Sequence, residues 1–323
     1  MNTTNHTPGR GALAPEAAGR ARTVVVDGTR QVYRVTGRGP VCLVHPGGPG
    51  AHSAYLRLPG LRDALTLVYL DPVGSGASDP LPDGNYSMSR YARCAEAVLD
   101  DLGAASGYFL GHSHGGFVAL QFALDRPGRL DGLILYDTAP VAGTVLTAAA
   151  AEEMTALVRR RPDDPEVADA ARTWHSAHVT RTLKITDDAS HRRYLDRVLP
   201  AYFADHRGTT GREGGFSLQV THDPNRLPAD WDVRDRLGTI DVPTLVVVGA
   251  HDVVCPPRFA HALHSALPRA RLCELRDSGH FGHIEEPDAF VAAVLDFLRD
   301  QAGDQERKQE RNQGNDQERE DRA

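Results

Sequence analysis

The sequence is short of lysine, of strongly basic stretches and of long apolar runs. Lys184 and Lys308 are its only lysines, and 36 basic residues stand against 43 acidic ones, which gives a net charge of −7. A chain with this charge and no basic stripe is a poor match to the phosphates of a nucleic acid. No run approaches the ~20 apolar residues that cross a bilayer. We therefore expect neither nucleic acid nor membrane as a partner.

Cysteine is also scarce. The four cysteines lie far apart without a Cys-x-x-Cys pair, at Cys42, Cys94, Cys255 and Cys273. This pattern predicts reduced core residues. Residues 1–22 lack the apolar stretch of a secretory signal, so we expect a cytoplasmic protein.

The length and composition indicate a globular chain. The 323 residues are 41% hydrophobic and 24% charged, which permits one large α/β domain or two smaller ones. We expect disorder over residues 1–22, and a disordered polar tail over 301–323. That tail has no apolar residue larger than alanine, and such a segment buries too little surface to offset its ordering entropy.

The hydrophobic pattern alternates between strands and helices. Short apolar runs predict strands at 23–26, 31–35, 41–44, 67–70, 108–110, 132–135, 244–248 and 271–275. Asp27-Gly28 predicts a hairpin between the first two. Helical periodicity marks 88–101, 115–125, 258–267 and 288–300. This alternation favours an α/β fold with a mostly parallel, doubly wound sheet.

One long stretch lacks strand signals. Residues 136–242 carry helical apolar stripes instead, and a structureless loop of this length would be unusual. We predict a helical cap over residues 139–232, inserted into a core formed by 23–138 and 233–300.

The strongest chemical signal is Gly111-His112-Ser113-His114-Gly115, which lies between an apolar strand and a helix. In that context Gly-x-Ser-x-Gly predicts a tight turn that presents the Ser113 hydroxyl as a nucleophile. A serine hydroxyl needs a base and an orienting carboxylate. Asp252 and His280 each follow a later predicted strand, so Ser113, Asp252 and His280 are the candidate catalytic residues.

Other residues compete for these roles. Asp277 is a rival for the acid, although it lies very near His280 in the sequence. His251 and His283 are rivals for the base. We expect His112 and His114 to be packed or solvated.

The oxyanion of an acyl-transfer intermediate needs two N–H donors. We expect one from His114, the residue after the nucleophile. The other should come from the loop His45-Pro46-Gly47-Gly48-Pro49-Gly50, where proline cannot donate. We favour Gly48, with Gly47 as the alternative.

Four motifs together resemble the proline iminopeptidase family of α/β hydrolases. They are Gly47-Gly48-Pro49-Gly50, the run from Asp71 to Ser78, Gly111 to Gly116, and Gly279-His280. The resemblance covers roughly residues 25–300 and implies an α/β-hydrolase fold with a helical cap. It also implies hydrolysis through an acyl-enzyme, usually with release of an N-terminal residue, and no metal or organic cofactor.

Some features depart from that family. Pro46 stands where the family has histidine, and Val73 where it usually has arginine. In relatives that remove N-terminal proline, cap glutamates bind the free amine, but the places near Trp174 and Tyr202 supply no carboxylate here. Glu153 and Glu213, and also Asp205 and Asp223, remain candidates for that amine, with Trp174 and Tyr202 as further substrate contacts.

The sequence thus predicts a serine hydrolase that removes an aminoacyl residue from a peptide or from a small molecule such as a specialised metabolite. An ester or lactone hydrolase is the alternative. A hydrolase fold kept only as a non-catalytic receptor is a third and more remote hypothesis.

Overall fold

A mixed sheet of eight strands organises the molecule, in a computed structural model that describes residues 19–210, 216, 218–226 and 230–320. Its strand order is β1-β2-β4-β3-β5-β6-β9-β10. The strands are β1 (Ala21–Val26), β2 (Thr29–Gly37), β3 (Val41–His45), β4 (Thr66–Asp71), β5 (Gly107–His112), β6 (Leu130–Tyr136), β9 (Thr244–Gly249) and β10 (Ala270–Leu275). Each of the eight predicted strands is present, and the sheet has the predicted α/β character.

The first two strands form the predicted hairpin at one edge of the sheet. Asp27 and Gly28 both have positive φ, 49° and 80°, as a two-residue hairpin turn of this kind requires. β2 pairs antiparallel with β1 and with β4. From β4 to β10 every neighbouring pair is parallel, so the ends of β3, β5, β6, β9 and β10 meet at the same edge.

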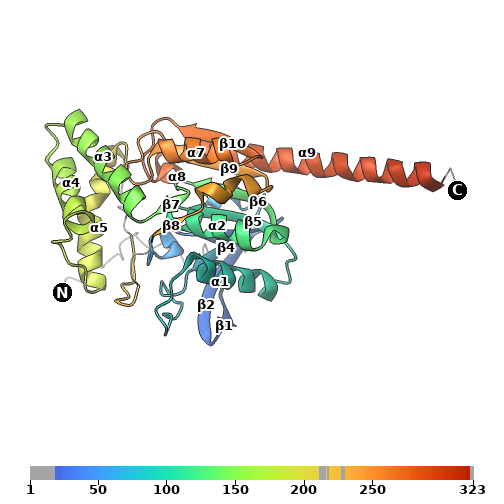
Figure 1. The fold of residues 1–323 in the computed structure, drawn as a ribbon, viewed down its shortest axis with the longest axis horizontal. Coiled ribbons are helices and arrows are strands. Elements are labelled where there is room, and N and C mark those ends of the chain that lie inside the picture. The colour runs from blue at the N-terminus through green and yellow to red at the C-terminus, as the bar shows by residue number, and fades with distance from the viewer. Residues whose placement is uncertain (1–18, 211–215, 217, 227–229, 321–323) are drawn as a thin grey trace, which may run out of the picture.

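Helices cover both faces of the sheet (Figure 1). α1 (Met88–Asp101), α2 (His114–Asp125) and α7 (Pro257–Ala266) pack on one face, where side chains such as Leu43, Phe109 and Leu133 point. α9 (Pro287–Glu320) and the short helices η2 (Ser53–Tyr55) and η3 (Pro59–Leu61) cover the other face. The minor helices η4 (Pro127–Arg129), η5 (Arg234–Thr239) and α8 (Gly282–Glu285) connect these elements. Burial on both faces explains why the central strands are apolar without alternation.

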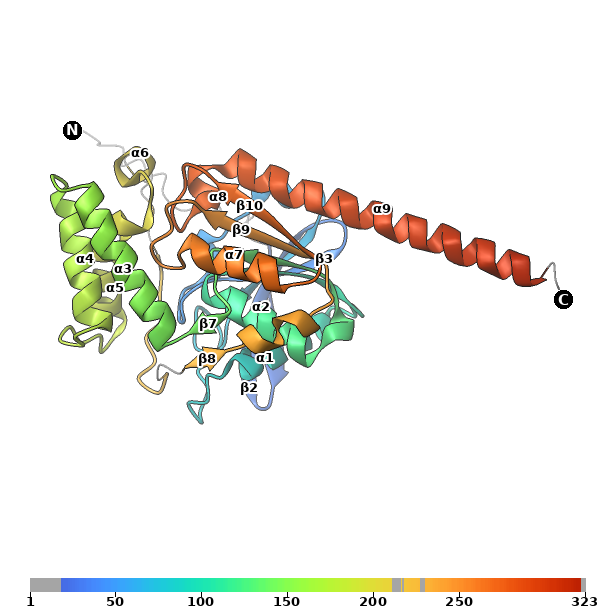
Figure 2. The same ribbon diagram turned by 45° about the horizontal axis from the view of Figure 1, so that its top comes forward.

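A group of helices lies between β6 and β9, where the cap is predicted. It comprises α3 (Thr144–Arg160), α4 (Pro165–His178), α5 (Asp188–Tyr202) and α6 (His206–Thr210). α3, α4 and α5 lie together to one side of the sheet in both views (Figure 2). Two short strands absent from the prediction, β7 (Val141–Ala142) and β8 (Trp231–Asp232), pair antiparallel where the chain leaves and re-enters the core.

The C-terminal segment differs from the sequence-based expectation. α9 continues to Glu320 and extends past the sheet (Figures 1 and 2), whereas a disordered tail from residue 301 was the expectation. The tail is rich in Glu, Gln and Arg, which are good helix formers, and it extends a helix that is already nucleated by core packing. Of the segment 1–22 that was expected to be disordered, residues 1–18 lie outside the described part, and Ala21 and Arg22 belong to β1. Within that part, no helix combines the length and apolarity that crossing a membrane requires.

Candidate active site

Ser113 occupies the tight turn between β5 and α2. Its backbone has φ 54° and ψ −119°, a strained conformation for a residue other than glycine. A Cβ on Gly115 would overlap the carbonyl oxygen of His45, and one on Gly111 would overlap the backbone of Gly115. The two glycines are therefore sterically required, and the turn leaves the Ser113 residue 8% exposed.

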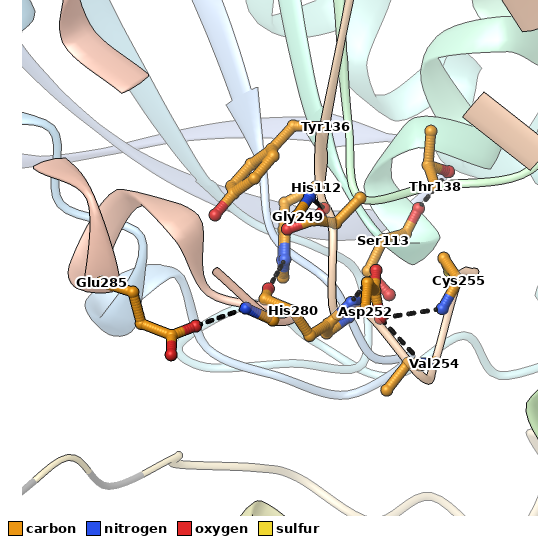
Figure 3. Close-up of polar contacts among 12 residues, drawn as sticks. His112, Ser113, Tyr136, Thr138, Gly249, Asp252, Val254, Cys255, His280 and Glu285 are labelled. Carbon is orange, nitrogen blue, oxygen red and sulfur yellow. Dashed lines mark hydrogen bonds and ion pairs between the residues drawn. The ribbon is translucent and has the colours of Figure 1, made fainter. Parts of the chain in front are cut away.

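Asp252 and His280 lie beside this turn and are hydrogen-bonded to each other (Figure 3). Nδ1 of His280 lies 2.9 Å from Oδ2 of Asp252. Oδ1 of Asp252 accepts the N–H groups of Val254 at 2.7 Å and Cys255 at 3.1 Å. Because the Asp252 carboxylate can only accept hydrogen bonds, Nδ1 of His280 carries the hydrogen of the neutral imidazole. Nε2 of His280 is then unprotonated and free to accept a proton. Both side chains are almost completely buried.

The third neighbour of this pair is Cys255, which the sequence reasoning placed only in the core. Its sulfur lies within 4.8 Å of ligand atoms of both Asp252 and His280, and its thiol is close enough to hydrogen-bond with Ser113. Burial, with the nearby Asp252 charge, raises the pKa of the Cys255 thiol well above its ordinary value. Cys255 is thus a neutral neighbour of Ser113 and a poor nucleophile. The sequence gave no sign of this contact, because Cys255 lies far from Ser113 along the chain.

The rival residues occupy other places. Asp277 and His251 are exposed. His283 is buried, with Nδ1 2.9 Å from the hydroxyl of Tyr136 and Nε2 3.1 Å from the carbonyl oxygen of Tyr55. Burial lowers the pKa of His283 to about 4. Of the histidines considered for the base, His280 is the one hydrogen-bonded to Asp252.

The loop after β3 carries the second predicted oxyanion donor. The N–H of Gly47 already donates to the hydroxyl of Tyr55 at 2.6 Å. The described backbone contacts give no such partner to the N–H of Gly48 or of His114, the first residue of α2. Gly47 therefore already has a partner within the fold, and the N–H groups of Gly48 and His114 remain the candidate donors. A negative intermediate would gain from two unpaired donors at this position.

The side chains of Tyr55, which is half-buried, and His112, which is buried, join this loop to the loop of His280. The Tyr55 hydroxyl accepts from Gly47 and therefore donates to Nδ1 of His112, 2.6 Å away. Nε2 of His112 then donates to the carbonyl oxygen of His280 at 2.9 Å. Burial, together with His280 and His283, lowers the pKa of His112 well below its ordinary value, which keeps the ring neutral and this donor order fixed.

Glu285 on α8 holds the His280 loop against the end of α5. Its carboxylate accepts three backbone N–H groups, from Gly279 at 2.7 Å, Ala204 at 2.8 Å and Asp205 at 3.1 Å. The N–H of His280 donates to the carbonyl oxygen of Tyr202 at 2.7 Å. Burial raises the pKa of Glu285 despite these donors. Nothing in the sequence marked Glu285, because its three partners come from two distant segments.

The predicted substrate contacts are only partly brought together. The Tyr202 ring lies 5.8 Å from the His280 ring, and Trp174 belongs to the buried hydrophobic cluster against which Tyr202 packs. Glu153 instead lies on α3, 3.9 Å from Arg160. Glu213 lies outside the described residues. Two further carboxylates already have partners: Asp205 accepts the N–H of Gly208, and Asp223 accepts from Tyr86 and from the N–H of Asn225.

Two groups of side chains bring possible metal ligands within 4.8 Å of one another, His112-Asp137-His280 and Asp252-Cys255-His280. Both ring nitrogens of His112 and Nδ1 of His280 are already engaged in hydrogen bonds. A cation would have to displace those bonds, so the donor set fits a hydrogen-bonded network better than a metal centre.

Known proteins resemble most of the chain. The family model for the alpha/beta hydrolase fold matches residues 40–287. A proline iminopeptidase of Saccharolobus solfataricus is 26% identical over 293 residues, which cover 83% of this chain and 87% of the relative. A 2-hydroxy-6-oxononadienedioate/2-hydroxy-6-oxononatrienedioate hydrolase of Cupriavidus pinatubonensis is 28% identical over 292 residues, covering 87% and 96%. The structure of an alpha/beta fold family hydrolase from Bacillus anthracis superposes with a TM-score of 0.65 at 21% identity, covering 87% of this chain and 99% of that one.

Proposed function

The chain belongs to the alpha/beta hydrolase fold family, and from that membership we propose that it is a serine hydrolase that works through an acyl-enzyme. Ser113 is the nucleophile, His280 the base and then the acid, and Asp252 the carboxylate that orients the imidazole. The observation that carries this proposal is the 2.9 Å bond between His280 and Asp252 beside the strained turn of Ser113.

The reaction follows from these roles. Nε2 of His280 takes the hydroxyl proton as Oγ of Ser113 bonds to the substrate carbonyl carbon, and the carbonyl oxygen becomes negative between the N–H groups of Gly48 and His114. His280 then gives its proton to the leaving nitrogen or oxygen as that bond breaks. Water, deprotonated by His280, attacks the acyl-enzyme, and the proton returns to Ser113. Among the described residues the His280 ring is hydrogen-bonded to Asp252 and not to Ser113, so the Ser113 hydroxyl must turn toward Nε2 for the reaction. Catalytic hydrogen bonds are often long or poorly aligned in a site without substrate.

Within this chemistry, an aminoacyl amide is the first candidate substrate. The Saccharolobus relative is a proline iminopeptidase by name, and the four motifs of that family are present. Tyr202, whose ring lies beside that of His280, would contact the acyl side chain, with Trp174 in the cluster against which Tyr202 packs.

An ester or lactone is the second candidate. One observation favours it: the described carboxylates considered for the free amine, Glu153, Asp205 and Asp223, already have partners. The Cupriavidus relative is also a hydrolase of a different substrate class by its name.

Three matched substrates separate the candidates: an aminoacyl anilide with a free amine, its N-acetyl form, and the corresponding ester. The Ser113→Ala variant gives the background rate. An aminopeptidase cleaves the free anilide and loses at least tenfold in kcat/KM on acetylation. Equal rates on the free and acetylated anilides refute amine recognition, and cleavage of the ester alone supports the second candidate.

A further inference from the structure

Asp137 is a buried carboxyl group that the proposed reaction does not use. It follows β6 directly and has φ 45°, a left-handed conformation that is costly for aspartate. The residue is 0% exposed. Oδ1 accepts the N–H of Gly249 at 2.8 Å, and Oδ2 has no hydrogen-bond partner among the described residues. An unpaired oxygen this deep costs stability, so the position calls for an explanation.

This carboxyl group faces the same imidazole as Asp252. A carboxyl oxygen of Asp137 and a ring nitrogen each of His112 and His280 lie within 4.8 Å of one another. Asp252 approaches His280 from the loop after β9, whereas Asp137 approaches from the end of β6. His280 therefore has two carboxyl groups around it, one hydrogen-bonded and one close by.

Burial and the nearby charges together decide the protonation of Asp137. Asp252 repels a second negative charge there, and Glu285 adds to that repulsion. Tyr136 and Tyr55 are neutral neighbours whose own ionisation is opposed by burial. Burial and then the Asp252 charge raise the pKa of Asp137 well above its ordinary value. Two carboxyl groups that share a buried site hold one proton between them, and removal of one charge eases ionisation of the other.

We propose that Asp137 is a second positioning carboxyl group for His280, silent while Asp252 is charged and able to orient the imidazole when Asp252 is absent. The inference rests on the proposed serine-hydrolase function. In the wild type the proton stays on Asp137 and the Asp252 carboxylate holds Nδ1–H. Without Asp252, Asp137 loses its proton to solvent, and rotation of its side chain brings a carboxylate to the imidazole.

The test compares the wild type with Asp252→Ala, Asp137→Asn and the double variant. The readout is the second-order rate of Ser113 labelling by a fluorophosphonate, which needs no knowledge of the natural substrate. We expect Asp137→Asn to cost at least tenfold more in the Asp252→Ala background than in the wild type. Asp277→Asn, which changes an exposed carboxylate, should leave the Asp252→Ala rate unchanged.

A pH series on Asp252→Ala alone provides a readout that does not depend on the folding of Asp137→Asn. Labelling then needs both a neutral His280 and an ionised Asp137, so the acid limb of log rate against pH should approach a slope of 2. A slope of 1, or equal losses from Asp137→Asn in both backgrounds, overturns the inference and leaves the proposed function intact. If the wild-type protein is not labelled at all, both this inference and the proposed serine-hydrolase function are overturned.

Discussion

Acid should unfold this protein through its buried neutral histidines, of which His283 is the clearest. The N–H of His283 donates to the Tyr136 hydroxyl, that hydroxyl donates to Nδ1, and Nε2 faces the carbonyl oxygen of Tyr55. A protonated ring would carry a hydrogen on Nδ1 and break this arrangement. Burial lowers the pKa of His283 from 6.5 to about 4, with some opposition from the Tyr55 carbonyl.

The sign and size of the effect follow from linkage. Below pH 6.5 the unfolded chain takes up a proton at this histidine, whereas the folded chain does so only near pH 4. The contribution of the neutral His283 to folding stability is therefore complete above pH 6.5, and it is lost as the pH falls from 6.5 to about 4. At 1.36 kcal/mol per pKa unit this amounts to about 3 kcal/mol, a large part of a typical net stability of about 5–15 kcal/mol. Asp137 and Glu285 have raised pKa values and act in the opposite direction, so the contribution of His283 must be isolated by substitution.

Urea unfolding of the wild type and His283→Gln over this pH range provides that isolation. At neutral pH we expect the variant to be less stable, because it loses a buried acceptor. On acidification the two stabilities should converge, by up to about 1.4 kcal/mol per pH unit. His264→Gln changes an exposed histidine and should track the wild type. Parallel curves for wild type and His283→Gln would show that His283 is not held neutral by the fold.

Two further substitutions test the local geometry. Glu285→Gln should lower kcat more than it raises KM, by about tenfold, because one of the three N–H groups loses its acceptor and the His280 loop loosens. An unchanged kcat would remove Glu285 from a positioning role. Gly115→Ala should abolish labelling of Ser113 and lower Tm, since its Cβ would overlap the His45 carbonyl, whereas Gly128→Ala has open space and should do neither. Normal labelling of Gly115→Ala would contradict the steric requirement.

The sheet could be predicted because each strand is marked by its own residues. β3, β6 and β9 are short runs rich in Val, Leu and Ile, β5 is apolar through Tyr108, Phe109 and Leu110, and Asp27-Gly28 fixes the hairpin. β7 and β8 escaped the prediction because two-residue strands have no periodicity and pair across the long insertion. The tail is helical where disorder was expected, because the expectation weighed its polarity and not its helix propensity.

The candidate site could be predicted where chain position determines geometry. Ser113, Asp252 and His280 each follow a strand, and parallel strands end at one edge of the sheet. The supporting residues could not be found in this way. Glu285 accepts from segments far apart in the sequence, and Tyr55 contacts His112 only because the chain after β3 folds back. Such contacts depend on tertiary packing, which local patterns do not encode.

The central claim is that the Ser113 hydroxyl is activated by His280, and covalent labelling tests it most directly. Wild type and Ser113→Ala are treated with a fluorophosphonate at about pH 8, where a histidine base is neutral, and the adduct is located by peptide mass spectrometry. We predict one adduct per chain, on Ser113, and none in the variant. An unlabelled wild type, or equal labelling of both proteins, would contradict the account.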